Sequence, residues 1–217
     1  MYSRGIILWI VDAQADFMFP DGKLYVSGAE QIIPNLKHLV EAATENGVLL
    51  VSSGDAHGPN DPEFEHFSPH CIKGTPGARI IPEGVVGKHL IIPNDPAFRL
   101  PDDLQDYRQI IFEKQTLDVF ANNHADELVK QLGSTAQYYV CGVVTEFCVR
   151  YAAQGLLERG CLVSIVKDAV QTLRAEDGCR ALDEMLSLGA RLITTREALA
   201  AIGADNLHSA GYKTARR

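Results

Sequence analysis

The stretch YYVCGVVTEFCVRY, residues 138–151, predicts a buried strand, a tight turn and the start of a helix. The run from Tyr138 to Val144 is apolar and rich in β-branched residues, which is typical of a buried parallel strand. Thr145 suits a helix N-cap, and Glu146 would place negative charge in the first helical turn. Cys148 would then lie just inside a helix N-terminus, where a thiolate is stabilised. The alternative is a structural core cysteine, because free cysteines are often buried.

The remaining chain alternates apolar strand patterns with helical ones. The expected strands are 5–11, 48–52, 109–112, 162–166 and 191–194, and the expected helices are 29–46, 125–132, 147–159, 176–188 and 196–202. This alternation predicts an α/β fold, with a mainly parallel sheet and helices on both faces. Residues 58–101 are rich in Pro and Gly and are expected to be irregular and functional. The small, polar tail from about 203 to 217 is expected to fray.

Composition limits the class of protein. The 217 residues fit one domain, 1–217, and a chain that is 46% hydrophobic and 22% charged is expected to be globular. A formal net charge of −8 argues against nucleic-acid binding, and no apolar run approaches the roughly 18 residues of a membrane span. The first residues resemble a strand more than a signal peptide. The five scattered cysteines therefore indicate reduced thiols and a cytoplasmic protein.

Four chemically capable side chains follow four different expected strands: Asp12, Asp55, Lys114 and Cys148. The carboxyl ends of parallel strands meet at one edge, where such sheets bind ligands. Asp12, Lys114 and Cys148 could act there as acid, cation and thiol, because a carboxylate with a raised pKa can accept a thiol proton. Taken singly, Asp12 could be a capping residue and Lys114 a surface lysine; their shared edge favours catalysis.

A second group of side chains has the donor types of a metal site. Asp55 and His57 form an Asp-x-His pair after a strand, and His70 could complete a partial shell that leaves positions for water. Glu63 is a further candidate ligand, directly or through water. The alternative is a pair of ordinary surface histidines.

Six motifs occur in a fixed order along the chain. They are VDAQADF at 11–17, DGKLYVSGAE at 21–30, DAH at 55–57, PHCIKGTPGA at 69–78, EK at 113–114 and CGVVTEFCV at 141–149. In this order they resemble the isochorismatase-like cysteine hydrolases, and among these most of all the nicotinamidases. The resemblance extends from about residue 6 to about residue 195 and is specific as a set, although each motif alone is weak.

The resemblance implies a three-layer α/β/α domain with a six-stranded parallel sheet. It makes Asp12 the general base, Lys114 the supporting cation and Cys148 the nucleophile. It also implies a cis peptide bond between Val143 and Val144, and an oxyanion hole formed by the N–H groups of Val144 and Cys148.

The resemblance also implies a cofactor and a substrate. Asp55, His57 and His70 would bind a divalent metal, Zn²⁺ or alternatively Fe²⁺ or Mn²⁺. The substrate would be a small amide and the protein a homo-oligomer. The aromatic rings of Phe17 and Phe67 would lie against the substrate.

Two departures from the nicotinamidase pattern leave the substrate open. Ala56 stands between the metal-site Asp and His, where nicotinamidases usually have an aromatic residue. After the lysine the chain reads KQTLDVFANNH, residues 114–124, in place of a Tyr-Ser stretch, which is why Phe120 is expected as a pocket wall. Nicotinamide hydrolysis is the first hypothesis, and the same chemistry on another amide or carbamoyl compound is the second. The third hypothesis is isochorismate-type hydrolysis, which Cys148 argues against because that reaction uses no cysteine nucleophile. The fourth is a non-catalytic scaffold, which the filled catalytic and metal positions argue against.

Overall fold

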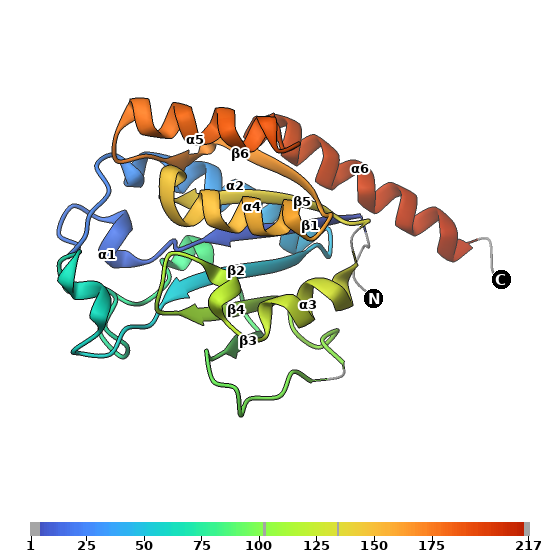
Figure 1. The fold of residues 1–217 in the computed structure, drawn as a ribbon. Coiled ribbons are helices and arrows are strands. Elements are labelled where there is room, and N and C mark those ends of the chain that lie inside the picture. Colours follow the sequence, from blue (N-terminus) through green and yellow to red (C-terminus); the bar gives the residue numbers. More distant parts are fainter. Residues whose placement is uncertain (1–4, 102, 134, 215–217) are drawn as a thin grey trace.

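A parallel β-sheet forms the centre of the molecule in the computed structural model, which describes residues 5–101, 103–133 and 135–214 (Figure 1). Within these residues the sheet has seven strands in the order β3-β4-β2-β1-β5-β6-β7, and every neighbouring pair is parallel. The strands are β1 (Ile6–Val11), β2 (Leu49–Asp55), β3 (His89–Ile92), β4 (Gln109–Lys114), β5 (Gln137–Val143), β6 (Leu162–Gln171) and β7 (Arg191–Ile193). The predicted parallel sheet is confirmed, with one strand more than expected.

The additional strand is β3, at one edge of the sheet, within the segment that the sequence predicts to be irregular. Its side chains are mostly exposed or half-buried, and only Ile92 is buried. An edge strand with so little burial lacks the apolar pattern that reveals a central strand.

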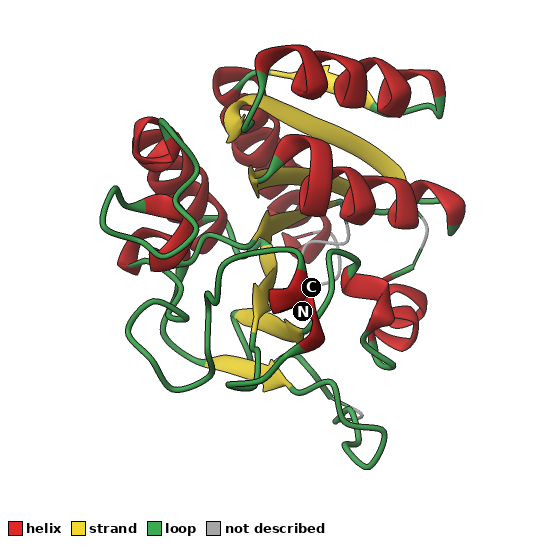
Figure 2. Ribbon diagram, turned by 60° about the vertical axis from the view of Figure 1, so that its left-hand side comes forward, coloured by secondary structure: helices red, strands yellow, loops and turns green. Residues whose placement is uncertain are grey.

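Helices cover both faces of the sheet, which gives the predicted three layers (Figure 2). The helices are α1 (Ala15–Met18), α2 (Ile33–Glu45), α3 (Ala125–Leu132), α4 (Arg150–Glu158), α5 (Ala175–Ser187) and α6 (Thr195–Thr214). Helices α2 and α6 pack together on one face, and α4 and α5 pack together on the other. Alternate residues of β1 enter the two cores: Trp9 packs on the α4 side and Leu8 on the α2 side, and both are fully buried.

The last helix, α6, is longer than expected. The sequence predicts a helix over 196–202, whereas α6 begins at Thr195 and continues to Thr214. A helix that has already formed gains one hydrogen bond for each residue added, so a weak helix-forming segment can extend it. Residues 215–217 lie outside the described residues. Nowhere in the described ranges is a helix both long enough and apolar enough to cross a membrane.

The carboxyl ends of the strands place the candidate residues together. In Figure 1 the arrowheads of β2 and β4 point to the left, toward α1 and the segment that follows β2. Parallel pairing sets Asp55 at the end of β2 directly opposite Lys114 at the end of β4. Asp12 follows the last residue of β1, and β5 ends five residues before Cys148.

Gly142 allows β1 and β5 to approach closely at this edge, which gives a first testable prediction. Its φ is 112°, and an added Cβ would lie 2.0 Å from the Val11 carbonyl oxygen. Gly142→Ala should therefore lower the free energy of unfolding by about 2–3 kcal/mol in urea titrations. Gly160→Ala is the matched control, because Gly160 also has a positive φ (73°) but open space around it. The control should cost only about 1 kcal/mol, and equal losses in both variants would contradict the steric explanation.

Candidate active site

A fully buried lysine joins the ends of three strands. Lys114 Nζ lies 2.8 Å from Asp12 Oδ2, 2.5 Å from Asp55 Oδ1 and 3.6 Å from Cys148 Sγ. Ser53 on β2 donates a hydrogen bond of 2.7 Å to the other oxygen of Asp12. All of these side chains are at least nine-tenths buried. The structure thus brings together the acid, the cation and the thiol that the sequence singles out.

The two carboxylates that share Lys114 differ in their proton affinity. Burial raises the pKa of Asp12 and outweighs the opposing charge of Lys114, and the nearby Asp55 charge adds to the rise. Burial alone would also raise the pKa of Asp55, but the Lys114 charge and the neighbouring imidazoles of His57 and His70 hold it well below its usual range. Asp12 is therefore the carboxylate that is suited to accept and return a proton.

Cys148 lies in a kinked helical turn, Thr145–Val149, in which Phe147 has non-helical backbone angles, and this turn leads into α4. Burial raises the pKa of its thiol well above the usual value, and Asp12 and Asp55 add to the rise although Lys114 opposes it. The expected stabilisation of the thiolate by a helix N-terminus is therefore outweighed by desolvation and by two nearby carboxylates. Thr145 is not the N-cap, because its hydroxyl donates to the Gln171 carbonyl. A neutral thiol here needs a base.

The backbone has unusual conformations around the site. The Val143–Val144 peptide bond is cis, in agreement with what the resemblance implies. Asp12 and Cys71 have positive φ angles of 47° and 43°, a region that non-glycine residues rarely adopt and that is enriched at functional sites. The oxyanion-hole role of Val144 and Cys148 stays a prediction.

The three predicted metal ligands form a compact buried cluster. His57 Nε2 lies 3.7 Å from Asp55 Oδ2, and His70 Nε2 lies 3.5 Å from the same oxygen. One ligand atom from each residue falls within 4.8 Å of the other two. The Glu63 carboxylate lies 3.8 Å from His57 Nε2. Asp55 therefore contacts both Lys114 and the histidine cluster.

The donor atoms of this cluster fit a divalent cation. His57 Nε2 and Glu63 Oε2 are buried and have no hydrogen-bond partner among the described residues. Buried polar atoms without partners are rare and costly, and a metal ion would satisfy both. Imidazole nitrogen and carboxylate oxygen are common ligands of Zn²⁺ and also bind Fe²⁺ and Mn²⁺.

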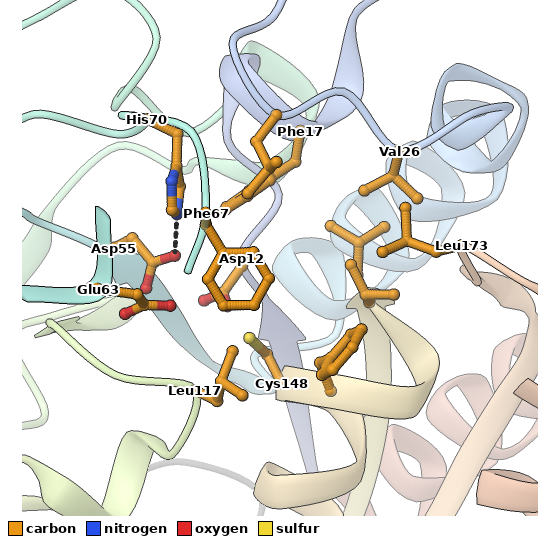
Figure 3. A pocket seen from close by; sticks show the side chains of 14 residues that line it. Asp12, Phe17, Val26, Asp55, Glu63, Phe67, His70, Leu117, Cys148 and Leu173 are labelled. Carbon is orange, nitrogen blue, oxygen red and sulfur yellow. Dashed lines mark ion pairs between the residues drawn. The ribbon is translucent and has the colours of Figure 1, made fainter. Parts of the chain in front are cut away.

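A narrow, mainly apolar pocket opens over Cys148, with a water-accessible volume of about 50 Å³. Its lining comprises Asp12, Phe17, Leu24, Val26, Asp55, Glu63, Phe67, His70, Leu117, Val143, Val144, Phe147, Cys148 and Leu173. Figure 3 shows three of the candidate metal ligands, Asp55, Glu63 and His70, on one side, Val26 and Leu173 on the opposite side, and Asp12 and Cys148 between them. Phe17 and Phe67 thus reach the pocket, as expected.

Phe120 does not line the pocket, which corrects the prediction. Its ring stacks on Trp9 with the ring centroids 6.1 Å apart, and the Arg159 guanidinium lies 3.7 Å from the Phe120 ring centroid. The short helix Val119–Ala121 turns this side chain into the core beneath α4. Leu117, three residues earlier, reaches the pocket instead.

Two buried polar side chains within the first motif hold the site together and were not singled out from the sequence. Gln14 donates to the carbonyl oxygens of Asp55 (2.8 Å) and Ala78 (2.7 Å) and accepts from the Asp55 N–H (2.6 Å). Asp16 accepts a 2.7 Å hydrogen bond from the Cys71 N–H, next to His70. Their only signal in the sequence is the presence of polar residues immediately after a buried strand.

From the sequence, Glu146 is expected only to add negative charge to the first turn of a helix. Its carboxylate instead accepts hydrogen bonds from the Thr172 hydroxyl (2.6 Å) and from the backbone N–H groups of Leu173 (3.0 Å) and Arg174 (3.1 Å). This fixes the segment after β6, so that Leu173 forms one side of the pocket mouth.

Comparisons with known proteins agree with the fold and the motifs. The isochorismatase domain matches residues 6–91 and 84–197. The nicotinamidase/pyrazinamidase of Mycobacterium tuberculosis is 26% identical over 200 residues, which cover 86% of this chain and 97% of that protein. The pyrazinamidase of Pyrococcus horikoshii, solved in complex with zinc, is 29% identical with a TM-score of 0.70 and covers 87% of this chain and 98% of its own. N-carbamoylsarcosine amidase of Thermoplasma acidophilum shares the fold at 22% identity, with a TM-score of 0.68 over 88% of this chain and 96% of its own. The chain belongs to the isochorismatase domain family.

Proposed function

We propose that this protein is an amidohydrolase that uses Cys148 as its nucleophile and converts nicotinamide to nicotinate and ammonia. The observation that carries the proposal is the buried cluster in which the Cys148 sulfur lies 3.6 Å from Lys114 Nζ, with Asp12 on the same ammonium group. The similarity to nicotinamidases and pyrazinamidases supports this choice of reaction.

The first half of the reaction forms a thioester. Asp12 accepts the thiol proton as Cys148 Sγ attacks the amide carbonyl carbon, and Lys114 stabilises the developing thiolate. The N–H groups of Val144 and Cys148 hold the oxyanion of the tetrahedral intermediate. When this intermediate collapses, the C–N bond breaks and Asp12 returns the proton to the leaving nitrogen, which departs as ammonia.

The second half regenerates the enzyme. A water molecule gives a proton to the Asp12 carboxylate and adds its oxygen to the thioester carbonyl carbon. The C–S bond then breaks, the carboxylic acid leaves, and Asp12 returns the proton to the Cys148 sulfur. Each half uses Asp12 first as a base and then as an acid, which suits a carboxyl whose pKa is raised.

Asp55, His57 and His70 would hold the divalent metal, with Glu63 as a further ligand. The chemistry available there from a bound Zn²⁺ is coordination of a substrate lone pair, such as that of a pyridine nitrogen. The cluster lies on one side of the pocket, so a ligand held there would direct the rest of the substrate toward Cys148.

The pocket favours a neutral substrate with an apolar body. None of the described residues that line it is a lysine or an arginine, and Lys114 beneath it already contacts two carboxylates. Phe17 and Phe67 offer faces for a flat ring. A substrate carboxylate, as in an N-carbamoyl amino acid or isochorismate, would be desolvated here without a lysine or arginine partner, and the charge of a bound divalent metal would already be offset by the Asp55 and Glu63 carboxylates. The second candidate function is therefore hydrolysis of another neutral, apolar amide.

Ammonia release by the zinc-loaded protein tests this assignment. We expect kcat/KM for nicotinamide to exceed that for an N-carbamoyl amino acid by about 10²-fold or more, because no lysine or arginine lines the pocket to pair with the substrate carboxylate. Turnover of benzamide without turnover of nicotinamide would establish the second candidate. Faster turnover of the anionic compound than of either neutral amide would contradict the proposal.

A further inference from the structure

Asp61 contacts the candidate metal ligand His57 on the side that faces away from the cluster. His57 is fully buried, and its Nδ1 lies 3.1 Å from Asp61 Oδ2. The Asp61 side chain is only 10% exposed. Its other oxygen, Oδ1, accepts a 3.0 Å hydrogen bond from the Glu63 N–H and thereby caps the short helix Pro62–Glu65. Oδ1 is thus bonded to the backbone, whereas Oδ2 lies beside the His57 ring.

The two ring nitrogens of His57 have different surroundings. Nδ1 lies only 3.1 Å from Asp61 Oδ2, whereas Nε2 faces Asp55 and Glu63 at 3.7 and 3.8 Å, and neither nitrogen forms an aligned hydrogen bond with the described residues. A proton on Nδ1 would be donated to Asp61, which leaves the Nε2 lone pair directed into the cluster. His70 has the same arrangement with a different partner, because its Nδ1 lies 2.8 Å from the Ser68 carbonyl oxygen.

We propose that Asp61 is a positioning residue for the metal, which holds His57 in the Nδ1–H tautomer so that Nε2 can bind the ion. This inference rests on the metal site of the proposed function. Asp61 itself also lies within 4.8 Å of His57 and Glu63 ligand atoms. The ring nitrogen that approaches Asp61 is Nδ1, at 3.1 Å, so a metal bound between Asp61 and that nitrogen would leave the buried Nε2 without a partner. A carboxylate behind a metal-binding histidine instead fixes its tautomer and strengthens it as a ligand.

The substitution Asp61→Asn tests the positioning of His57 without changing the packing, because the two side chains have nearly the same shape. The asparagine has one acceptor oxygen where Asp61 uses two. If that oxygen continues to cap the helix, the amide NH₂ faces His57 Nδ1 and favours the opposite tautomer, Nε2–H. If the oxygen turns to His57, the Glu63 N–H loses its acceptor.

Asp118→Asn is the matched control. Asp118 caps the short helix Val119–Ala121 in the same way, since its Oδ1 accepts a 2.9 Å hydrogen bond from the Phe120 N–H. Asparagine is as good an N-cap as aspartate, so the loss of charge at a cap is tested without a change at His57.

Competition with a chromophoric chelator gives the Zn²⁺ affinity of each protein. We expect Asp61→Asn to bind Zn²⁺ about 10–100-fold more weakly than the wild type, and Asp118→Asn to bind it as the wild type does. An Asp61→Asn affinity equal to that of the control would overturn the proposal. Absence of Zn²⁺ binding in the wild type would instead contradict the metal site itself.

The tautomer of His57 gives a second readout that needs no metal. In ¹⁵N NMR spectra of the metal-free protein, His57 should carry its proton on Nδ1 in the wild type and in Asp61→Glu, which keeps the carboxylate. It should change to the Nε2–H form in Asp61→Asn. An Nε2–H form in the wild type would overturn the proposal even if Asp61→Asn failed to fold.

Discussion

Cys148→Ala should lower the rate of nicotinamide hydrolysis by about 10⁴-fold or more, because loss of a nucleophile removes the whole covalent route. The Cys148 sulfur lies on the pocket floor, 3.6 Å from Lys114 Nζ, so its removal leaves no thiol among the residues that line the pocket. Zn²⁺ affinity should not change, because the side chain is not one of the candidate ligands. Initial rates of ammonia release measure the effect.

Cys179→Ala is the control for the loss of a thiol as such. Cys179 is exposed on α5 and lies outside the pocket lining. This variant should keep the wild-type rate. Similar rates in Cys148→Ala and Cys179→Ala would show that Cys148 is not the nucleophile.

The other large effect is expected from Lys114→Met, which removes the only cation that contacts both Asp12 and Asp55 among the residues that the structure describes. Asp12 would stay buried without a partner charge, and Asp55 would keep only the imidazoles of His57 and His70 at 3.7 and 3.5 Å. Breaking a buried ion pair in this way costs about 3–5 kcal/mol, so the metal-free variant should unfold at a much lower urea concentration. Amide hydrolysis should be lost as well, since the charge beside the Cys148 sulfur is gone.

Lys73→Met provides the comparison for Lys114→Met. Lys73 pairs with Glu113 at 2.6 Å, but its side chain is 63% exposed, and exposed ion pairs contribute little to stability. We expect a loss of less than about 1 kcal/mol and unchanged activity. Equal destabilisation by both substitutions would contradict the view that burial makes Lys114 essential.

The catalytic edge could be predicted from the sequence because parallel strands bring their carboxyl ends together. Asp12, Asp55 and Lys114 each end or directly follow an apolar run, so a one-dimensional pattern was enough to place them. The upward shift of the Cys148 pKa could not be predicted from such a pattern. It depends on desolvation and on two carboxylates from other strands, and these outweigh the local effect of the helix end.

The parts that were missed depend on how loops fold. The six-residue spacing between Lys114 and Phe120 predicts Phe120 as a pocket wall. The turn of the chain after β4 instead places Phe120 in the core and Leu117 in the pocket. Leu173 reaches the mouth only because Glu146 fixes its loop. Asp61 lies in the Pro-rich segment after β2, where no periodic pattern indicates which carboxylate faces His57.

The central claim is that an acyl group is carried by Cys148 during turnover, and the mass of the intact protein tests it most directly. Zinc-loaded protein is mixed with excess nicotinamide, quenched with acid at a series of times and analysed by mass spectrometry with peptide mapping. We predict a gain equal to one nicotinoyl group, located on the peptide that contains Cys148 and absent from Cys148→Ala. Ammonia release with the acyl group on another residue, or with no acylated protein at any time of quenching, would contradict the account.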